Sequence, residues 1–324
     1  MDKLLEVRDV KKYFPVQGGF FKKTIGHVKA VDGVSLYIRR GETLGLVGES
    51  GCGKSTLGRT IARLYEPTEG EIIYDGIDIA GLKGQELKNL RRKMQIIFQD
   101  PYSSLNPRMN VSTIVGEAML AHGMVKKGAE FNARVLQVVE NCGLSDYHIY
   151  RYPHQFSGGQ RQRIGIARAL ALNPEFIVCD EPVSALDVSI QSQILNLMMD
   201  LQEKMGLSYL FISHDLSVVK HISDRIGVMY LGSIIELADK HTLYSDPLHP
   251  YTRALLSAIP VADPTNIRKM EPIIGEIPSN VNVPTGCKFH TRCVYAKDIC
   301  KEQVPEYKEI KPEHFVACHF AGEI

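Results

Sequence analysis

The segment GESGCGKST at 48–56 matches the phosphate-binding pattern G-x-x-x-x-G-K-S/T in full. Glycines in this pattern let backbone N–H groups wrap phosphates, and the helix that follows presents its positive end to them. Lys54 is expected against the β- and γ-phosphates, Ser55 on Mg²⁺ through its hydroxyl, and Thr56 on an α-phosphate. A chance glycine-rich turn is the alternative, but the apolar strand before the loop and the helical spacing after it favour a nucleotide site. The expected loop residues are Gly48, Glu49, Ser50, Gly51, Cys52, Gly53, Lys54, Ser55 and Thr56.

Two adjacent acids, Asp180 and Glu181, end the apolar run IVCDE at 177–181. Asp180 is suited to hold Mg²⁺ through a water and Glu181 to polarise an attacking water, because phosphoryl transfer needs mainly positioning and charge neutralisation. Gln99 could reach both Mg²⁺ and that water, and His214 could contact the γ-phosphate and couple it to Glu181. Alone, Gln99 would be interpreted as a surface residue and His214 as a structural one, so both roles depend on the phosphate loop.

A second anion-binding helix start is expected in FSGGQRQR at 156–163. The Ser157 hydroxyl, the amides of Gly158 and Gly159, and Gln160 resemble a phosphate cradle, and the helix dipole adds to it. One ATP has a single γ-phosphate to share between two such cradles. We therefore expect this one to face a nucleotide held by another subunit.

Strands that alternate with helices must position these residues. TLGLVG (43–48), MQIIFQ (94–99), EFIVCDEP (175–182) and LSYLFISHD (207–215) are interpreted as strands, and EGEIIYDGIDIA as a hairpin that turns at Asp75-Gly76. QGGFFKKTIGH (17–27) is expected to be a hairpin connection, and 111–172 looks helical, as an inserted subdomain would. The pattern predicts an α/β fold with a largely parallel, helix-covered sheet.

Composition bounds the remaining possibilities. The 324 residues carry a formal net charge of +1, so nucleic-acid binding receives no support from net charge. There is no apolar run of the roughly 18–20 residues that span a bilayer, and the N-terminus lacks the apolar core of a signal peptide. We expect a cytoplasmic protein that reaches a membrane only through partners.

Taken in order, these motifs resemble those of the ATP-binding cassette (ABC) ATPases, over about 4–245. The resemblance gives Tyr13 as the aromatic that stacks on adenine, 48–56 as Walker A, Gln99 as the Q-loop residue and His214 as the switch histidine. It also gives IVCDE as Walker B with the catalytic Glu181, SALD (184–187) with Asp187 as the D-loop, and 157–160 as the signature motif, with Phe156 replacing the commoner Leu. It implies a P-loop NTPase cassette with a parallel-sheet core, an antiparallel β subdomain and a helical subdomain at about 102–172. Each nucleotide would lie between the Walker A of one subunit and the signature motif of the other.

FQDPYSSLNPR (98–108) and PLHPYTRALLSAIP (247–260), followed by a cysteine-bearing tail, resemble the peptide-importer ATPases of the oligopeptide/dipeptide and nickel branch. That branch implies a motor at the cytoplasmic face of the membrane, with a second, related ATPase subunit, two transmembrane permeases and an extracellular solute-binding protein. The region just after Gln99 would receive a permease coupling helix. A nickel or other solute importer of this branch is the alternative, and an ABC ATPase acting on nucleic acid is disfavoured because the chain has one cassette and no basic block.

Four of the seven cysteines crowd the end of the chain, which we divide into an ATPase domain (1–250) and a C-terminal domain (251–324). They are Cys287, Cys293, Cys300 and Cys318, separated by five, six and seventeen residues. Zinc modules usually begin with tighter pairs, and four thiolates suit a [4Fe–4S] cluster, although no common ferredoxin spacing is matched. Zinc remains the alternative, in which His290, His314 or His319 could replace a cysteine. The spacing also allows free thiols or disulfides at these four positions.

Overall fold

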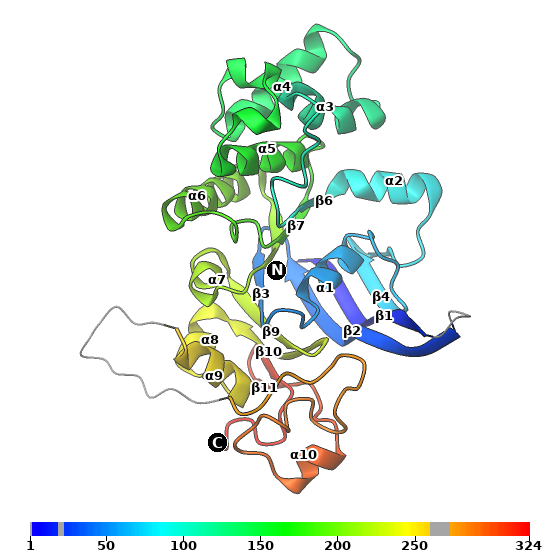
Figure 1. The fold of residues 1–324 in the computed structure, drawn as a ribbon, viewed down its shortest axis with the longest axis vertical. Helices are drawn as coiled ribbons and strands as arrows, with labels where there is room; N and C mark the ends of the chain where they lie inside the picture. The colour runs from blue at the N-terminus through cyan, green and yellow to red at the C-terminus, as the bar shows by residue number, and fades with distance from the viewer. Residues whose placement is uncertain (1, 19–22, 260–272) are drawn as a thin grey trace, which may run out of the picture. The chain divides into compact units, whose positions relative to one another are not determined.

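The computed structural model describes residues 2–18, 23–259 and 273–324, which form two compact units (Figure 1). One unit is mainly Gly81–Ile212. The other contains Leu4–Tyr37, Thr43–Ala80 and Ser213–Ile324. The phosphate loop and the terminal cysteines therefore share a unit. Positions 260–272 of the expected C-terminal domain, and 19–22 of the expected hairpin connection, lie outside the described residues.

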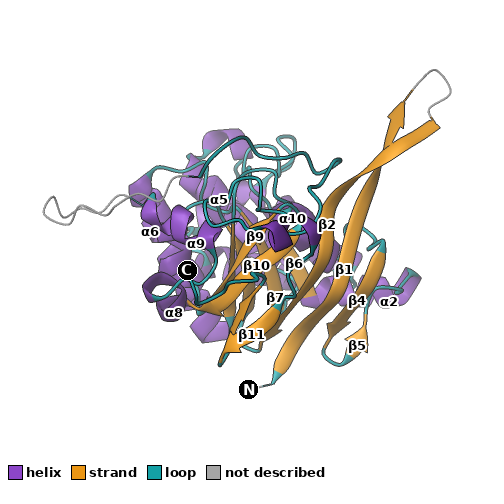
Figure 2. Ribbon diagram, turned by 90° about the horizontal axis from the view of Figure 1, so that it is seen from below, coloured by secondary structure: helices purple, strands orange, loops and turns teal. Residues whose placement is uncertain are grey.

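An antiparallel sheet occupies the first part of the second unit, where its strands run side by side in Figure 2. Its strand order is β2-β1-β4-β5. β1 pairs with β4 through Leu5 opposite Tyr74 and Val7 opposite Ile72. Asp75 and Gly76 both have positive φ, 51° and 78°, as a two-residue hairpin turn requires, so the predicted turn is confirmed. The strands are β1 (Lys3–Gly18), β2 (Lys23–Arg39), β4 (Glu69–Tyr74) and β5 (Ile77–Asp78).

A mixed set of strands carries the phosphate loop in the same unit. β3 (Thr43–Val47) runs parallel to β9 (Arg225–Tyr230), which pairs antiparallel with β10 (Ser233–Asp239). The chain then returns near its end, where β12 (His314–Val316) pairs with β10 and β11 (Lys308–Lys311) pairs with β12. The helices here are α1 (Lys54–Ile61), α7 (Leu216–Ile222), α8 (Lys240–Ser245), α9 (Pro250–Ser257) and α10 (Asp298–Glu302).

The other unit combines three parallel strands with a group of helices. β7 (Phe176–Asp180) lies between β6 (Met94–Ile97) and β8 (Ser208–Ile212), and every residue of β7 and β8 is buried. This burial explains their continuous apolar sequences. Residues 111–172 contain helices α3, α4 and α5, which pack on one another, so the predicted helical character is confirmed (Figure 1). The helices are α2 (Gly84–Lys93), α3 (Val111–Ala121), α4 (Ala129–Asn141), α5 (Gly158–Leu170), α6 (Val188–Met205) and the short 3₁₀ helices Asp146–Tyr150 and Pro153–Gln155.

The predicted α/β class is thus confirmed, with parallel strands flanked by helices and a separate antiparallel sheet. Among the helices of residues 2–18, 23–259 and 273–324, none combines the length and apolar character needed to cross a bilayer.

Candidate functional site

The phosphate loop joins β3 to α1, as the sequence predicts. Gly48 and Gly53 have positive φ, 150° and 109°. A Cβ on Gly48 would lie 2.2 Å from the Met229 carbonyl oxygen, and a Cβ on Gly53 would lie 2.0 Å from the Ala30 carbonyl oxygen. Only glycine fits at such close backbone approaches. The turn therefore depends on these two residues having no side chain.

Lys54 opens α1 with a buried side chain, and its ammonium donates to the carbonyl oxygens of Gly48 at 2.7 Å and Glu49 at 3.0 Å. Ser55 and Thr56 follow in the first turn. Gly53 precedes the helix and has no side chain to cap it, so no side chain of the N-cap residue satisfies the first N–H groups of α1. Burial raises the pKa of the Cys52 thiol, in keeping with a small packing residue.

The predicted acids and the Q-loop residue come together in the other unit. Asp180 is fully buried at the end of β7, and Glu181 follows it with a φ of 47°. The Gln99 Nε2 donates to the Glu181 Oε2 at 2.9 Å. A non-glycine residue held in the left-handed region carries backbone strain of the kind found at functional sites. Here the Glu181 N–H is fixed by a 3.0 Å bond to the Ile212 carbonyl oxygen.

The signature segment forms the start of α5. The Ser157 Oγ accepts from the Gln160 N–H at 3.3 Å, and the Gln160 Oε1 accepts from the Ser157 N–H at 3.1 Å, which is a capping box. A Cβ on Gly159 would lie 2.5 Å from the Ile190 side chain, and one on Gly158 would lie 3.3 Å from Leu186. The glycines thus let α5 begin against the start of α6, and Ser157 stays exposed at its tip.

The remaining motif residues occupy helix starts or loops. Asp187 caps α6, where its Oδ1 accepts from the Ile190 N–H at 3.1 Å and from the Ser189 hydroxyl at 2.7 Å. The bond from Ser189, and after it the bond from Ile190, lowers the pKa of the Asp187 carboxyl. His214 is exposed directly before Asp215, which caps α7. The structure places His214 in the unit of the phosphate loop and Glu181 in the other.

Tyr13 lies on β1 beside charged side chains. Its hydroxyl donates a hydrogen bond to the Asp32 Oδ1, and the Lys29 ammonium lies 5.7 Å from its ring centroid. Burial, followed by the bond to Asp32, raises the pKa of the Tyr13 hydroxyl.

The four terminal cysteines line one small cavity of about 20 Å³, together with Phe289 and Phe320. Burial raises the pKa of Cys287 to about 12 and of Cys318 to about 11. Within the part of the chain that the structure describes, no group of three or more His, Cys, Asp or Glu side chains is placed to hold a metal ion. The geometry therefore gives the predicted cluster no direct support, although the thiols share a cavity.

The histidines considered as zinc ligands have other partners. The buried His314 ring lies 2.7 Å from the Glu236 Oε1, through Nε2. The His290 Nδ1 lies 2.8 Å from the Cys287 carbonyl oxygen, and the His319 Nε2 lies 3.0 Å from that of Gln303. His314 is thus a core residue of β12, and it does not line the cysteine cavity.

Sequence reasoning missed two basic residues near the end of the chain, of which Arg292 contacts the phosphate loop and Lys288 contacts Asp32 beside Tyr13. Arg292 forms a bidentate pair with Glu49, and Lys288 binds Asp32 at 2.8 Å. The ion pairs join positions more than two hundred residues apart, so no local spacing signals them.

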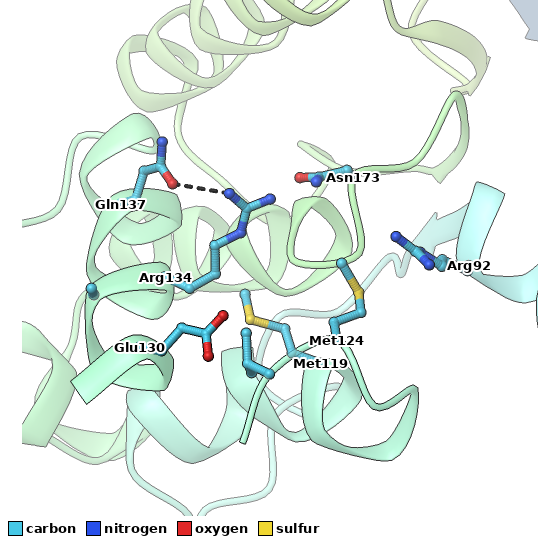
Figure 3. Close-up of a pocket in the computed structure, with 9 residues that line it drawn as sticks. Arg92, Met119, Met124, Glu130, Arg134, Gln137 and Asn173 are labelled. Carbon is cyan, nitrogen blue, oxygen red and sulfur yellow. Dashed lines mark hydrogen bonds between the residues drawn. The ribbon is translucent and has the colours of Figure 1, made fainter. Parts of the chain in front are cut away.

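A groove of about 580 Å³ lies in the unit that is mainly Gly81–Ile212, which we call the helical unit (Figure 3). Two arginines, Arg92 and Arg134, and two methionines line it, and Arg134 donates to the Gln137 Oε1 at 3.1 Å. The lining residues are Arg92, Met119, Met124, Val125, Glu130, Ala133, Arg134, Gln137 and Asn173.

Residues 31–184 match the family described as ABC transporter, and residues 235–300 match the oligopeptide/dipeptide transporter C-terminal region. The chain is 60% identical over 319 residues to the oligopeptide transport ATP-binding protein AppF of Bacillus subtilis (strain 168), covering 98% of this chain and 97% of the relative. The chain belongs to the ABC transporter ATP-binding subunits of the oligopeptide/dipeptide branch.

Solved structures agree with this family. The ATP-binding cassette MJ0796, a dimer in a post-hydrolysis state with ADP and phosphate, is 31% identical, with a TM-score of 0.63, covering 73% of this chain and 98% of that one. The cassette cbiO1 of Clostridium perfringens, part of the complex cbiONQ, is 26% identical, with a TM-score of 0.64, covering 76% of this chain and 92% of that one. The predicted ABC cassette fold is confirmed. The boundary near 250 and the separate C-terminal domain stay predictions.

Proposed function

We propose that this ABC ATPase is the motor subunit of an importer for oligopeptides or dipeptides. The observation that carries the proposal is the similarity to AppF over nearly the whole of both chains. The match of residues 235–300 to the oligopeptide/dipeptide transporter C-terminal region supports the same class of cargo.

In this proposal the motif residues neutralise phosphate charge and position the attacking water during ATP hydrolysis. Lys54 would turn its ammonium from its own loop carbonyls to the β- and γ-phosphates, and the loop N–H groups would hold the remaining oxygens. Mg²⁺, when bound by Ser55 and by Asp180 through a water, neutralises phosphate charge. Glu181 would orient and polarise the attacking water, and the 2.9 Å bond from Gln99 supports this role because it fixes the carboxylate. His214 would contact the γ-phosphate.

The signature helix would act on a partner's nucleotide. Its exposed Ser157 and the N–H groups of Gly158 and Gly159 would bind the γ-phosphate held by the Walker A loop of a second, related ATPase subunit. Asp187 of the D-loop would lie at the same junction. The solved dimeric cassette MJ0796 supports such a pairing as a property of this family.

The groove of the helical unit would receive a permease segment. Its methionines are flexible apolar residues that suit an adaptable docking surface, and its two arginines would favour an acidic or C-terminal helix end on the partner. It is lined by α3, which follows the segment after Gln99 along the chain. We place this subunit at the cytoplasmic face of the membrane, on two permeases fed by an extracellular binding protein.

The Glu181→Gln variant tests the motor assignment. In the assembled importer it should bind ATP normally while hydrolysis and peptide uptake fall roughly 10²–10⁴-fold, the contribution usual for a general base. Glu203→Gln, which changes an exposed glutamate of α6, is the matched control and should retain both activities. Near-normal turnover in Glu181→Gln would refute the role of Glu181, and ATPase activity unaffected by permeases and peptide would refute the importer assignment.

We propose that the four cysteines around this cavity would ligate a [4Fe–4S] cluster, with zinc as the alternative metal. The donor set supports this proposal, because Cys287, Cys293, Cys300 and Cys318 all line the cavity and soft thiolates suit iron–sulfur clusters. Protein purified without oxygen should contain iron and acid-labile sulfide in equal amounts and be brown. Cys300→Ser should lose both, whereas Cys142→Ser, outside the cavity, should keep them. Zinc alone would decide for the alternative, and protein without either metal would refute a metal site.

A further inference from the structure

A segment near the end of the chain, residues 280–292, contacts the phosphate loop and the residues around Tyr13. We call it the brace. It contacts three separate points of the nucleotide-binding region, through Asn280, Lys288 and Arg292. All of these contacts lie within one unit of the structure.

Arg292 makes the strongest contact, on the loop itself. Its two terminal nitrogens donate to the two carboxylate oxygens of Glu49 at 2.7 and 3.0 Å. The side chains are 7% and 21% exposed, and the guanidinium carbon lies 5.8 Å from the Tyr230 ring centroid. A bidentate, largely buried pair of this kind fixes both distance and orientation.

The backbone of Glu49 transmits this restraint to the phosphate site. Its carbonyl oxygen accepts from the Lys54 ammonium at 3.0 Å, and its N–H donates to the Tyr251 hydroxyl at 3.0 Å. Glu49 is therefore held at its side chain, its N–H and its carbonyl. Since the loop binds phosphates through its backbone, fixing Glu49 preorganises the loop.

The other two contacts restrain the edges of the site. Lys288 donates to Asp32 at 2.8 Å and to the Ser233 hydroxyl at 2.6 Å, and Asp32 also accepts from the Tyr13 hydroxyl. The Asn280 Nδ2 donates to the Gly51 carbonyl oxygen at 3.0 Å. The brace thus reaches the predicted adenine side and the phosphate side together.

We propose that the brace positions the phosphate loop for ATP, with Arg292 as the positioning residue acting through Glu49. This inference rests on the proposed ATPase function and assigns to the cysteine-bearing end of the chain a part in nucleotide affinity. Cys287 directly precedes Lys288, and Cys293 directly follows Arg292. The residues that contact the nucleotide-binding region therefore lie next in sequence to cysteines that line the cavity.

The first test measures ATP affinity and kinetics in the assembled importer. Arg292→Met keeps most of the side-chain volume and removes the charge, and it should raise the Kd and KM for ATP about tenfold, within the range of typical coupling between sites. The kcat at saturating ATP should change little, and Arg292→Lys should recover part of the affinity. Lys311→Met is the control, because it breaks an exposed ion pair with Asp246 at 2.5 Å in the same part of the chain.

A double-mutant cycle tests the route through Glu49. If Arg292 acts through that carboxylate, Glu49→Gln should weaken ATP binding by a similar factor, and Arg292→Met should add little in its presence. Independent, multiplying effects, or an Arg292→Met variant that binds ATP as tightly as the parent, would overturn the proposal.

The unaltered protein gives a measurement that does not depend on whether the variants fold. Coupling between sites is reciprocal, so ATP should slow amide hydrogen exchange within 280–292 as well as within the phosphate loop. Protection of the loop without protection of the brace would overturn the inference and leave the ATPase function intact. A chain that binds no ATP at all would refute the proposed function itself.

Discussion

Glu236, a fully buried carboxylate on β10, should be among the most important side chains for stability in its unit. Its Oε1 accepts from the Leu248 N–H at 2.7 Å and lies 2.7 Å from the His314 Nε2, and its Oε2 accepts from the His249 N–H at 3.0 Å. Burial lowers the pKa of His249 to about 4, so its neutral ring can accept from the Tyr251 N–H at 3.0 Å and cap α9. One carboxylate therefore joins β10 to the start of α9 and to β12.

Replacing Glu236 by Ala would leave these buried donors without an acceptor. Each unsatisfied buried donor costs about 1–3 kcal/mol, and removing one partner of a buried pair costs about 3–5 kcal/mol in total. We expect Glu236→Ala to lower the free energy of unfolding by about 4 kcal/mol. Glu236→Gln keeps one carboxamide oxygen as an acceptor and should cost roughly half as much.

Urea denaturation followed by far-UV circular dichroism measures this difference, since the chain has no tryptophan to report by fluorescence. Glu309→Ala is the matched control: this exposed glutamate on β11 accepts from the Glu313 N–H at 2.7 Å, and its loss should cost less than about 1 kcal/mol. A Glu236→Ala variant within about 1 kcal/mol of the parent would show that water or other groups satisfy these donors and would refute the reasoning.

Three further predictions concern Ser157, Gly53 and His148. Ser157→Arg should abolish hydrolysis at the paired subunit's Walker A while this chain still binds a fluorescent ATP analogue; normal hydrolysis would contradict the interface assignment. Gly53→Ala would place a Cβ 2.0 Å from the Ala30 carbonyl oxygen at a φ of 109°, so ATP binding should be lost and the Tm lowered, whereas unchanged binding would show that the loop can shift. Burial lowers the pKa of His148, whose Nδ1 accepts from the Ser145 N–H, so the unfolded chain binds the proton more readily. The free energy of unfolding should therefore fall as pH drops through about 6.5, and His148→Asn should show a shallower fall in a urea series; an equal slope would exclude His148 as the cause.

Features encoded by consecutive residues could be predicted from the sequence. The phosphate loop between β3 and α1, the Asp75-Gly76 turn and the helices of 111–172 each depend on local backbone preferences or on periodicity. Two adjacent methionines of α6 differ in burial: Met198 lies in the core, whereas Met199 is 37% exposed. Periodicity identifies a helix face only to within a residue or so at its margin.

The structure adds contacts between distant parts of the sequence. These contacts connect the end of the chain to β10 and to the nucleotide-binding region. The sequence predicts a C-terminal domain at 251–324, and the structure shows that β12 of this region pairs with β10 and that the brace contacts the phosphate loop and Asp32. Neither short β-strands nor single basic residues carry a local signal of their partners, because strand pairing and ion pairs form only once the fold brings the segments together. The motifs identify the chemistry of the ATP site. The preorganisation that we propose for this site would depend instead on isolated side chains such as Arg292, which lies outside the cassette motifs and more than two hundred residues from Glu49.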